Sequence, residues 1–143
     1  MQIKKALQRL LEEQPILVKN LTFEPDTIDH AKLKTGESLY WARNESGRWL
    51  SVDEASEEVI LFEEVEEEVD TQDETVVFQN RDFEFSYEGE GTLVDEDGTE
   101  LEQIRYKDYE ADGEILRVVE AEVTGEQVVS LGQVVAETEI GEV

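Results

Sequence analysis

The sequence predicts a mainly β protein: an antiparallel meander, closed as a small barrel or folded as a sandwich, with one short amphipathic helix at the N-terminus. Three observations predict this fold class. Two tryptophans flank one tight turn, a later segment alternates strictly between aromatic and polar residues, and turns containing Gly or Asp recur roughly every ten residues. The 143 residues are enough for one domain with a real hydrophobic core.

The N-terminal helix is predicted over residues 1–14. Apolar residues recur between Ile3 and Leu11 at the spacing of one helix face. Pro15 then ends the helix, because the residue before a proline is driven out of the helical conformation. A helix this short needs a surface to pack on. We expect it to cover the open end of the sheet or, alternatively, to dock on a partner or a membrane surface, while residues 15–143 form a single β-rich domain.

Residues 16–37 have a weaker pattern. Short strands are expected at 16–19 and 21–23, a turn begins at Pro25, and an irregular stretch leads into the next hairpin. His30, the one histidine, falls in this stretch and is expected to lie in a polar loop facing solvent.

The strongest local signal is the hairpin that holds both tryptophans. Trp41 and Trp49 lie on either side of the turn at 44–47 and can meet as cross-strand neighbours. A third strand is expected at 59–65, where the β-branched content outweighs a competing helical spacing of the apolar residues.

The clearest single strand is residues 82–88. Phe83, Phe85 and Tyr87 are expected on one face and polar residues on the other, which is typical of a sheet with one buried and one solvated face. A strand at 75–79 precedes it through a turn at Asn80-Arg81. Turns are then expected at 89–91, 95–98, 111–113 and 124–125, with strands at 92–94, 100–109, 114–123 and 127–135.

The chain is strongly acidic. It has 38 acidic and 12 basic residues, a net charge of −26. Such a surface repels phosphate, so we expect no direct binding of nucleic acid. The densest stretch is 53–74, which we expect to bulge partly into solvent. Within it we select a candidate surface for a protein partner, which we expect to be basic: Glu63, Glu64, Glu66, Glu67 and Glu68.

Motifs that carry chemistry are missing. There is no cysteine, no nucleophile elbow surrounds a serine, and no glycine-rich phosphate loop precedes a helix. The Asp-Gly turn at 95–98 does not fit the register of a calcium-binding loop. With so many acids, paired carboxylates occur by chance and carry no weight. We therefore expect no enzyme, cofactor or metal, and we select a candidate aromatic core or ligand cavity: Trp41, Trp49, Phe83, Phe85 and Tyr87.

Further positions accompany the tryptophan hairpin: Tyr40-Trp41, Arg48-Trp49-Leu50, Tyr106 with Tyr109-Glu110, Gly113 with Leu116 and Val119-Glu120, and Ser130-Leu131-Gly132. Over about residues 20–140 this pattern resembles a widespread bacterial family of uncharacterised β-rich domains, often carried in two copies. The chain departs from the pattern at Ala42-Arg43, where the family commonly has an acid and an aromatic residue, and it lacks the usual glycine-led opening. The resemblance implies a β-rich fold with no assigned activity, and relatives that look like accessory proteins of envelope and stress systems.

Three functions from different classes follow as hypotheses. The first is a non-enzymatic interaction module that binds a protein partner through its acidic surface. The second is an acidic mimic of DNA that inhibits a DNA-binding protein. The third is a β-barrel that binds a small ligand. No long apolar run or signal peptide is visible, so we expect a cytoplasmic protein without a transmembrane segment.

Overall fold

The computed structural model describes residues 1–143 and confirms the mainly β class. Most of the chain is strand, and one α-helix stands at the N-terminus. None of its helices has the length and the apolar character that a membrane span requires. The elements are α1 (Ile3–Leu11), β1 (Ile16–Val18), β2 (Leu21–Phe23), β3 (Thr27–Leu33), β4 (Ser38–Arg43), β5 (Arg48–Asp53), β6 (Glu58–Val65), β7 (Thr75–Phe78), β8 (Arg81–Val94), β9 (Glu100–Ala111), β10 (Glu114–Ala121), β11 (Gln127–Val135), the 3-10 turn η1 (Glu137–Glu139) and β12 (Ile140–Glu142).

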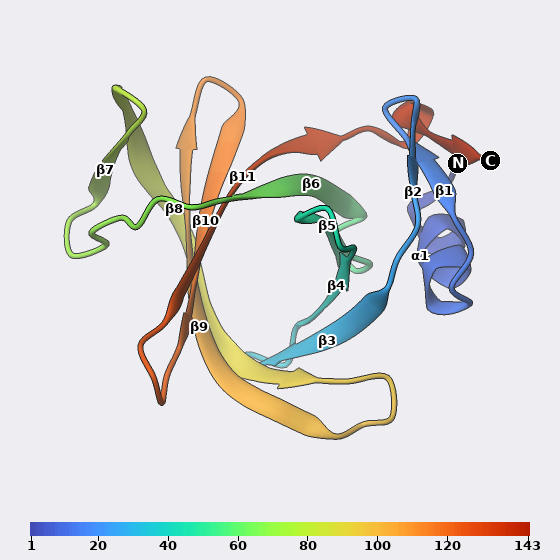
Figure 1. Ribbon diagram of the computed structural model, residues 1–143, viewed down its shortest axis with the longest axis horizontal. Coiled ribbons are helices and arrows are strands. Elements are labelled where there is room, and N and C mark those ends of the chain that lie inside the picture. The colour runs from blue at the N-terminus through green and yellow to red at the C-terminus, as the bar shows by residue number, and fades with distance from the viewer.

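The main sheet closes on itself as a barrel, the first of the two predicted alternatives. Its strands follow the order β3-β4-β5-β6-β11-β10-β9-β8, all antiparallel neighbours, and β3 pairs back onto β8. Figure 1 shows the closed ring that these strands form. Closure leaves no free edge among the eight, while β7 extends the sheet beyond the ring by pairing with the first part of β8.

Two glycines, Gly89 and Gly91, lie inside β8, although a turn was predicted at 89–91. That prediction was wrong, because these glycines serve close approach rather than chain reversal. A Cβ on Gly89 would lie 2.5 Å from the ring of Tyr106, and a Cβ on Gly91 would lie 2.8 Å from the Cα of Leu33 on β3. Both glycines therefore let neighbouring groups approach the wall of the barrel.

The barrel interior is filled by aromatic and aliphatic side chains. Trp41 and Trp49 are both buried, with ring centroids 5.3 Å apart, as the hairpin predicted. Trp49 stacks on Phe62 at 4.5 Å and donates a 2.9 Å hydrogen bond from Nε1 to the Oγ of Ser130. Tyr106 meets Trp41 edge-on at 5.8 Å. These contacts make the two tryptophans part of the packed core.

A second core covers the outer wall of the barrel. Strands β12, β1 and β2 form a small separate sheet, and α1 packs with it against the outward-facing residues of β3 to β6. Figure 1 shows this unit beside the ring, with both chain ends in it. The N-terminal ammonium group donates to the carbonyl oxygens of Glu137 and Ile140, both at 2.9 Å. The helix therefore covers the outer wall, not an open end of the sheet.

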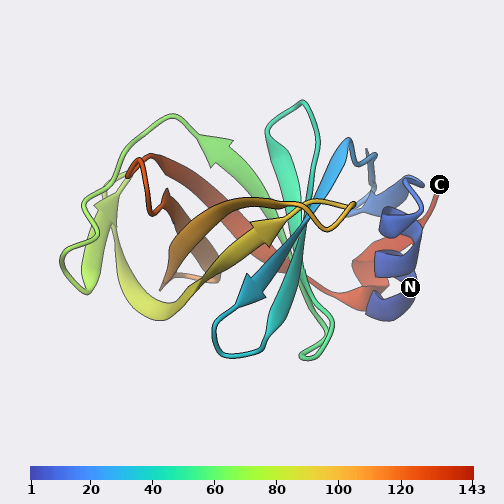
Figure 2. The same ribbon diagram turned by 90° about the horizontal axis from the view of Figure 1, so that it is seen from below.

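The β7–β8 hairpin lies at the other end of the molecule's long axis from α1, as Figure 2 shows, and it covers a third core. There the β7–β8 hairpin folds over the outer faces of β9, β10 and β11, with Phe83 and Tyr109 fully buried beneath it. The acidic loop 66–74 runs alongside. Gln127 anchors this loop with two hydrogen bonds to the backbone of Val69, and Lys107 donates to the carbonyl of Thr71 at 3.1 Å.

Three local predictions need correction. Residues 27–33 form strand β3 rather than a turn and irregular segment, so His30 lies on a strand, stacked on Tyr40 at 4.5 Å. The β7–β8 turn is Gln79-Asn80, one residue earlier than expected, because both residues take the positive φ that a tight hairpin requires. The C-terminal strand β12 was not expected, since three residues carry no period of their own.

Candidate functional site

One end of the barrel opens into a cavity of about 250 Å³, which we call the mouth cavity. The strand registers place it where β4 begins, β5 ends, β6 begins and β9 ends. Its lining is Glu37, Leu39, Ser51, Asp53, Glu58, Ile60, Ser86, Tyr87, Tyr106, Asp108, Glu110, Ile115, Arg117 and Val134. Five carboxylates therefore share this space with one arginine, which gives the lining a strongly negative balance.

Arg117 lines the cavity and is fixed by a buried ion pair. Its side chain is 4 % exposed, and its Nε and Nη2 donate to the two carboxylate oxygens of Asp108 at 2.8 and 2.9 Å. Its Nη1 donates to the Oγ of Ser51 at 2.8 Å. The guanidinium carbon lies 4.6 Å from the ring centroid of Tyr106 and 4.8 Å from that of Phe62. Burial alone would lower the pKa of Arg117, but the charge and hydrogen bonds of Asp108 outweigh it, so the net pKa is raised and the guanidinium stays charged.

The remaining carboxylates repel one another. Asp53 and Glu58 are direct cross-strand partners, an arrangement in which like charges cost stability. Partial burial raises the pKa of Glu58; Arg117 lowers it, and the charges of Asp53, Asp108 and Glu110 raise it further. The net effect is an increase. This rim is therefore under electrostatic strain that a bound cation would relieve.

A β-bulge turns Tyr87 into the cavity. On β8, Phe85 pairs with Tyr109 and Tyr87 pairs with Asp108, so the register slips by one residue between them. Phe85 therefore stays on the outer side beside Tyr109, while Tyr87 lies toward the barrel mouth, 6.0 Å from Tyr106. Bulges are frequent where a side chain is re-aimed beside a functional site.

The candidate aromatic cavity or core does not form one cluster in the structure. Trp41 and Trp49 lie in the barrel core, Phe83 lies in the outer core beneath β7, and Tyr87 lines the mouth cavity. Phe85 and Tyr87 are 41 % and 40 % exposed, so the expectation that Phe83, Phe85 and Tyr87 share one buried face was wrong. Strict alternation in the sequence does not reveal a bulge.

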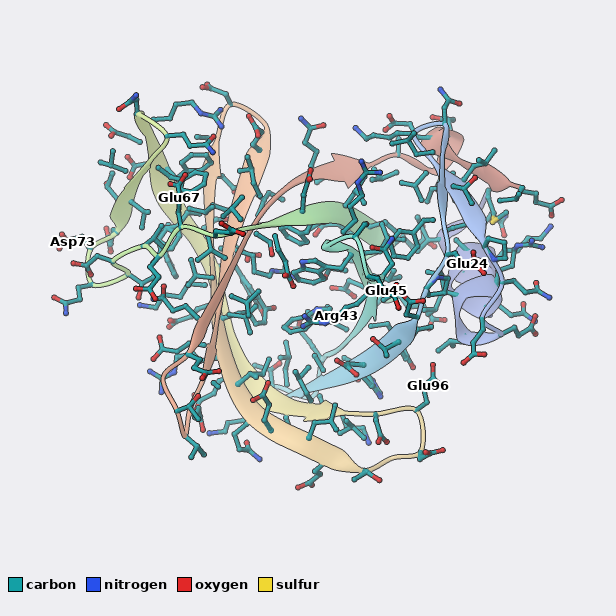
Figure 3. The ribbon with its side chains drawn as sticks, viewed as in Figure 1. Glu24, Arg43, Glu45, Glu67, Asp73 and Glu96 are labelled. Carbon is teal, nitrogen blue, oxygen red and sulfur yellow. The ribbon has the colours of Figure 1, made fainter.

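The candidate acidic surface lies away from the mouth. Glu63 and Glu64 are at the far end of β6, and Glu66, Glu67 and Glu68 follow on the exposed loop before β7. Figure 3 shows Glu67 and Asp73 on this loop. None of the five lines the mouth cavity, and Glu64 lies 3.6 Å from the guanidinium of Arg43.

Arg43 is the last residue of β4 and lies at the end of this strand that is farther from the mouth cavity. It projects toward the ring in Figure 3, with its guanidinium carbon 5.4 Å from the ring centroid of Trp49 and its Nε 3.7 Å from a carboxylate oxygen of Asp29. Partial burial raises the pKa of Asp29, although Arg43 acts to lower it. The guanidinium of Arg43 therefore packs on the rings of both tryptophans.

The barrel itself is what matches a known family. The family model described as Domain of unknown function (DUF4178) matches residues 26–137, which run from the start of β3 past the end of β11. The chain belongs to this family. The resemblance to a family of uncharacterised β-rich domains is thereby confirmed, and α1, β1, β2 and β12 lie outside the matched DUF4178 region. Neither a curated protein nor a solved structure matches the chain.

Tyr87 was predicted from the sequence as a possible cavity residue, whereas Asp108 and Arg117 were not. A usable signal was present: Arg117 stands in the middle of the apolar run Ile115-Leu116-Arg117-Val118-Val119. A charge at such a position requires a buried partner. Which acid among 38 supplies it depends on the β9–β10 register, which places Asp108 directly opposite.

The strain at Glu58 predicts a pH dependence of stability. Because its pKa is raised in the folded state above the ordinary value of 4.5, folding is penalised above the raised pKa, and the penalty disappears as the pH falls to 4.5. We expect Glu58→Gln to be more stable than the wild type at neutral pH, with the gap closing as the pH is lowered. Urea unfolding at several pH values measures this. Glu67→Gln, on the exposed loop, controls for the change in net charge, and an equal gain from Glu67→Gln would contradict the prediction.

Proposed function

We propose that this domain is a non-enzymatic interaction module that binds a basic protein partner through the mouth of its barrel. One observation carries the proposal: five carboxylates and a single, internally paired arginine line one solvent-open cavity. Positive charge on a partner would relieve the repulsion among these carboxylates. Complementary charge of this kind speeds encounter and makes binding sensitive to salt.

The placement of the other reactive groups supports a binding role over a catalytic one. His30 is on the outer side of β3, stacked on Tyr40, and does not line the mouth cavity. The hydroxyl oxygen of Ser51 accepts a hydrogen bond from Arg117, and the hydroxyl makes no hydrogen bond to a carboxylate or histidine that could act as its base. Both carboxylate oxygens of Asp108 accept hydrogen bonds from the same arginine. Ser51 and Asp108 therefore fix the position of Arg117.

Capture from the source cell's lysate tests the proposal. The bait is the full chain, compared with a mouth variant carrying Asp53→Asn, Glu58→Gln and Glu110→Gln. We expect the wild type to retain a basic partner at low salt, and the partner to be lost at high salt and with the mouth variant. Mass spectrometry identifies the captured protein.

The matched control carries Glu66→Gln, Glu67→Gln and Glu68→Gln, which removes the same number of charges from the exposed loop. This loop variant is expected to capture the partner as the wild type does. A partner lost with the loop variant and kept with the mouth variant would contradict the proposal and assign binding to the loop.

A second candidate function is the binding of a small free molecule in the same cavity. The cavity volume of about 250 Å³ and the aromatic rings of Tyr87 and Tyr106 favour it. In that case no basic protein is captured, and the affinity for a small molecule depends on the same mouth residues.

A further inference from the structure

We propose that the mouth cavity receives the side chain of one lysine residue of the partner, whose ammonium group donates hydrogen bonds to the hydroxyl of Tyr106 and to the carboxylates around it. This inference rests on the proposed function and names the group that the site recognises. It is carried by an unpaired polar group inside the cavity, by the distribution of acceptors, and by the charge pattern of the rim.

The unpaired group is the hydroxyl of Tyr106. This residue is only 2 % exposed and lines the mouth cavity. Its hydroxyl makes no hydrogen bond within the protein, and it is not among the polar atoms sealed from solvent, so it opens into the cavity. Gly89 keeps this position clear, since a Cβ there would lie 2.9 Å from the hydroxyl oxygen. The Tyr106 hydroxyl therefore has no hydrogen-bond partner within the protein, and a ligand in the cavity can supply one.

Burial strongly raises the pKa of Tyr106, so the hydroxyl stays neutral and offers its lone pairs to a donor. Neighbouring Arg117 does not make the cavity a site for an anionic ligand, because its charge is already matched by Asp108. The cavity as a whole therefore favours a donor that carries positive charge.

The acceptors surround the cavity instead of forming one fork. Asp53 comes from β5, Glu58 from β6 and Glu110 from β9. An ammonium group is a compact charge with three donors that can point to separate strands, whereas a guanidinium prefers one coplanar carboxylate. Asp108, which does form such a bidentate pair, is already occupied by Arg117. This arrangement favours lysine over arginine.

The walls suit the aliphatic part of a lysine side chain. Leu39, Ile60 and Ile115 line the cavity together with the tyrosine rings. Methylene groups can pack on these surfaces while the ammonium group reaches the acceptors. The ring of Tyr87, brought to the mouth by the bulge, adds a face on which a cation is attracted.

A titration of the full chain with Nα-acetyl-lysine methylamide at low salt tests the inference. The backbone amide signals are monitored by NMR during the titration. We expect saturable shifts that cluster on β5, β6 and β9 at millimolar probe. The same probe with its side-chain amine acetylated keeps the shape and removes the charge, and it is expected not to bind. Tyr106→Phe, which deletes only the hydroxyl, should weaken the affinity about tenfold or more, as expected for one hydrogen bond to a charged donor.

Tyr40→Phe is the matched control, because Tyr40 stacks on His30 outside the barrel, and it should leave the affinity unchanged. Equal binding of the acetylated probe, or an unchanged affinity of Tyr106→Phe, would overturn the inference. Binding of n-butylamine without binding of the lysine probe would also overturn it and assign the cavity to small free amines.

The two proposals can fail separately. If the lysine probe does not bind but the mouth variant still loses its protein partner, the lysine inference is wrong and the interaction module stands. If the captured partner is indifferent to the mouth variant, the interaction module is wrong, whatever the probe does.

Discussion

Asp108→Ala is expected to lower the free energy of unfolding by about 3–5 kcal/mol, the cost of leaving one member of a buried ion pair without its partner. The reason is the position of Arg117, which is 4 % exposed and surrounded by the rings of Tyr106 and Phe62. Without Asp108 its guanidinium keeps one hydrogen bond, to Ser51. Rings attract a cation, but they do not replace a carboxylate that accepts two charged hydrogen bonds. Urea unfolding followed by tryptophan fluorescence measures the loss.

Two further variants separate the ion pair from a general loss of an acid. Asp73→Ala, on the exposed loop before β7, should change stability by less than about 0.5 kcal/mol. The double variant Asp108→Leu with Arg117→Met should recover much of the loss, because a buried pair can often be replaced by apolar groups of similar volume. If Asp108→Ala were as stable as Asp73→Ala, the role assigned to the ion pair would be wrong.

The same ion pair explains what could be predicted from the sequence and what could not. Trp41 and Trp49 were placed correctly in one packed hairpin, since aromatic residues beside a short turn are a local signal. Arg117 and Asp108 are nine positions apart, and only the β9–β10 register brings them together. Register is set by the turn and by the core on both sides of the sheet, which a local pattern does not contain.

The mouth cavity could not be predicted from the sequence either, because its residues also come together only through the arrangement of the strands. Alternation along residues 82–88 placed Phe85 and Tyr87 on one face, but the bulge between them sends them to different sides of the sheet. Likewise, the acids that line the cavity come from distant strands, and in the sequence they are indistinguishable from the acids of loop 66–74. The candidate acidic surface was therefore placed at the densest acidic run. Closure of the barrel instead brings Glu37, Asp53, Glu58 and Glu110 around one opening.

Closure depends on the seam between β3 and β8, where Leu33 pairs with Gly91. We expect Gly91→Ala to destabilise the protein by about 3 kcal/mol, the upper part of the usual range for overpacking. Its Cβ would overlap the carbonyl oxygen of Lys32 and lie 2.8 Å from the Cα of Leu33, and backbone atoms cannot move aside as a flexible side chain can.

Gly141→Ala is the control, since the atom nearest to its added Cβ would be 3.8 Å away. Urea unfolding measures the cost, and faster hydrogen exchange at the Lys34 amide, which donates across the seam to Glu90, would locate it. Equal stability of the two variants would contradict the close approach of Gly91 to β3 and the role assigned to it in barrel closure.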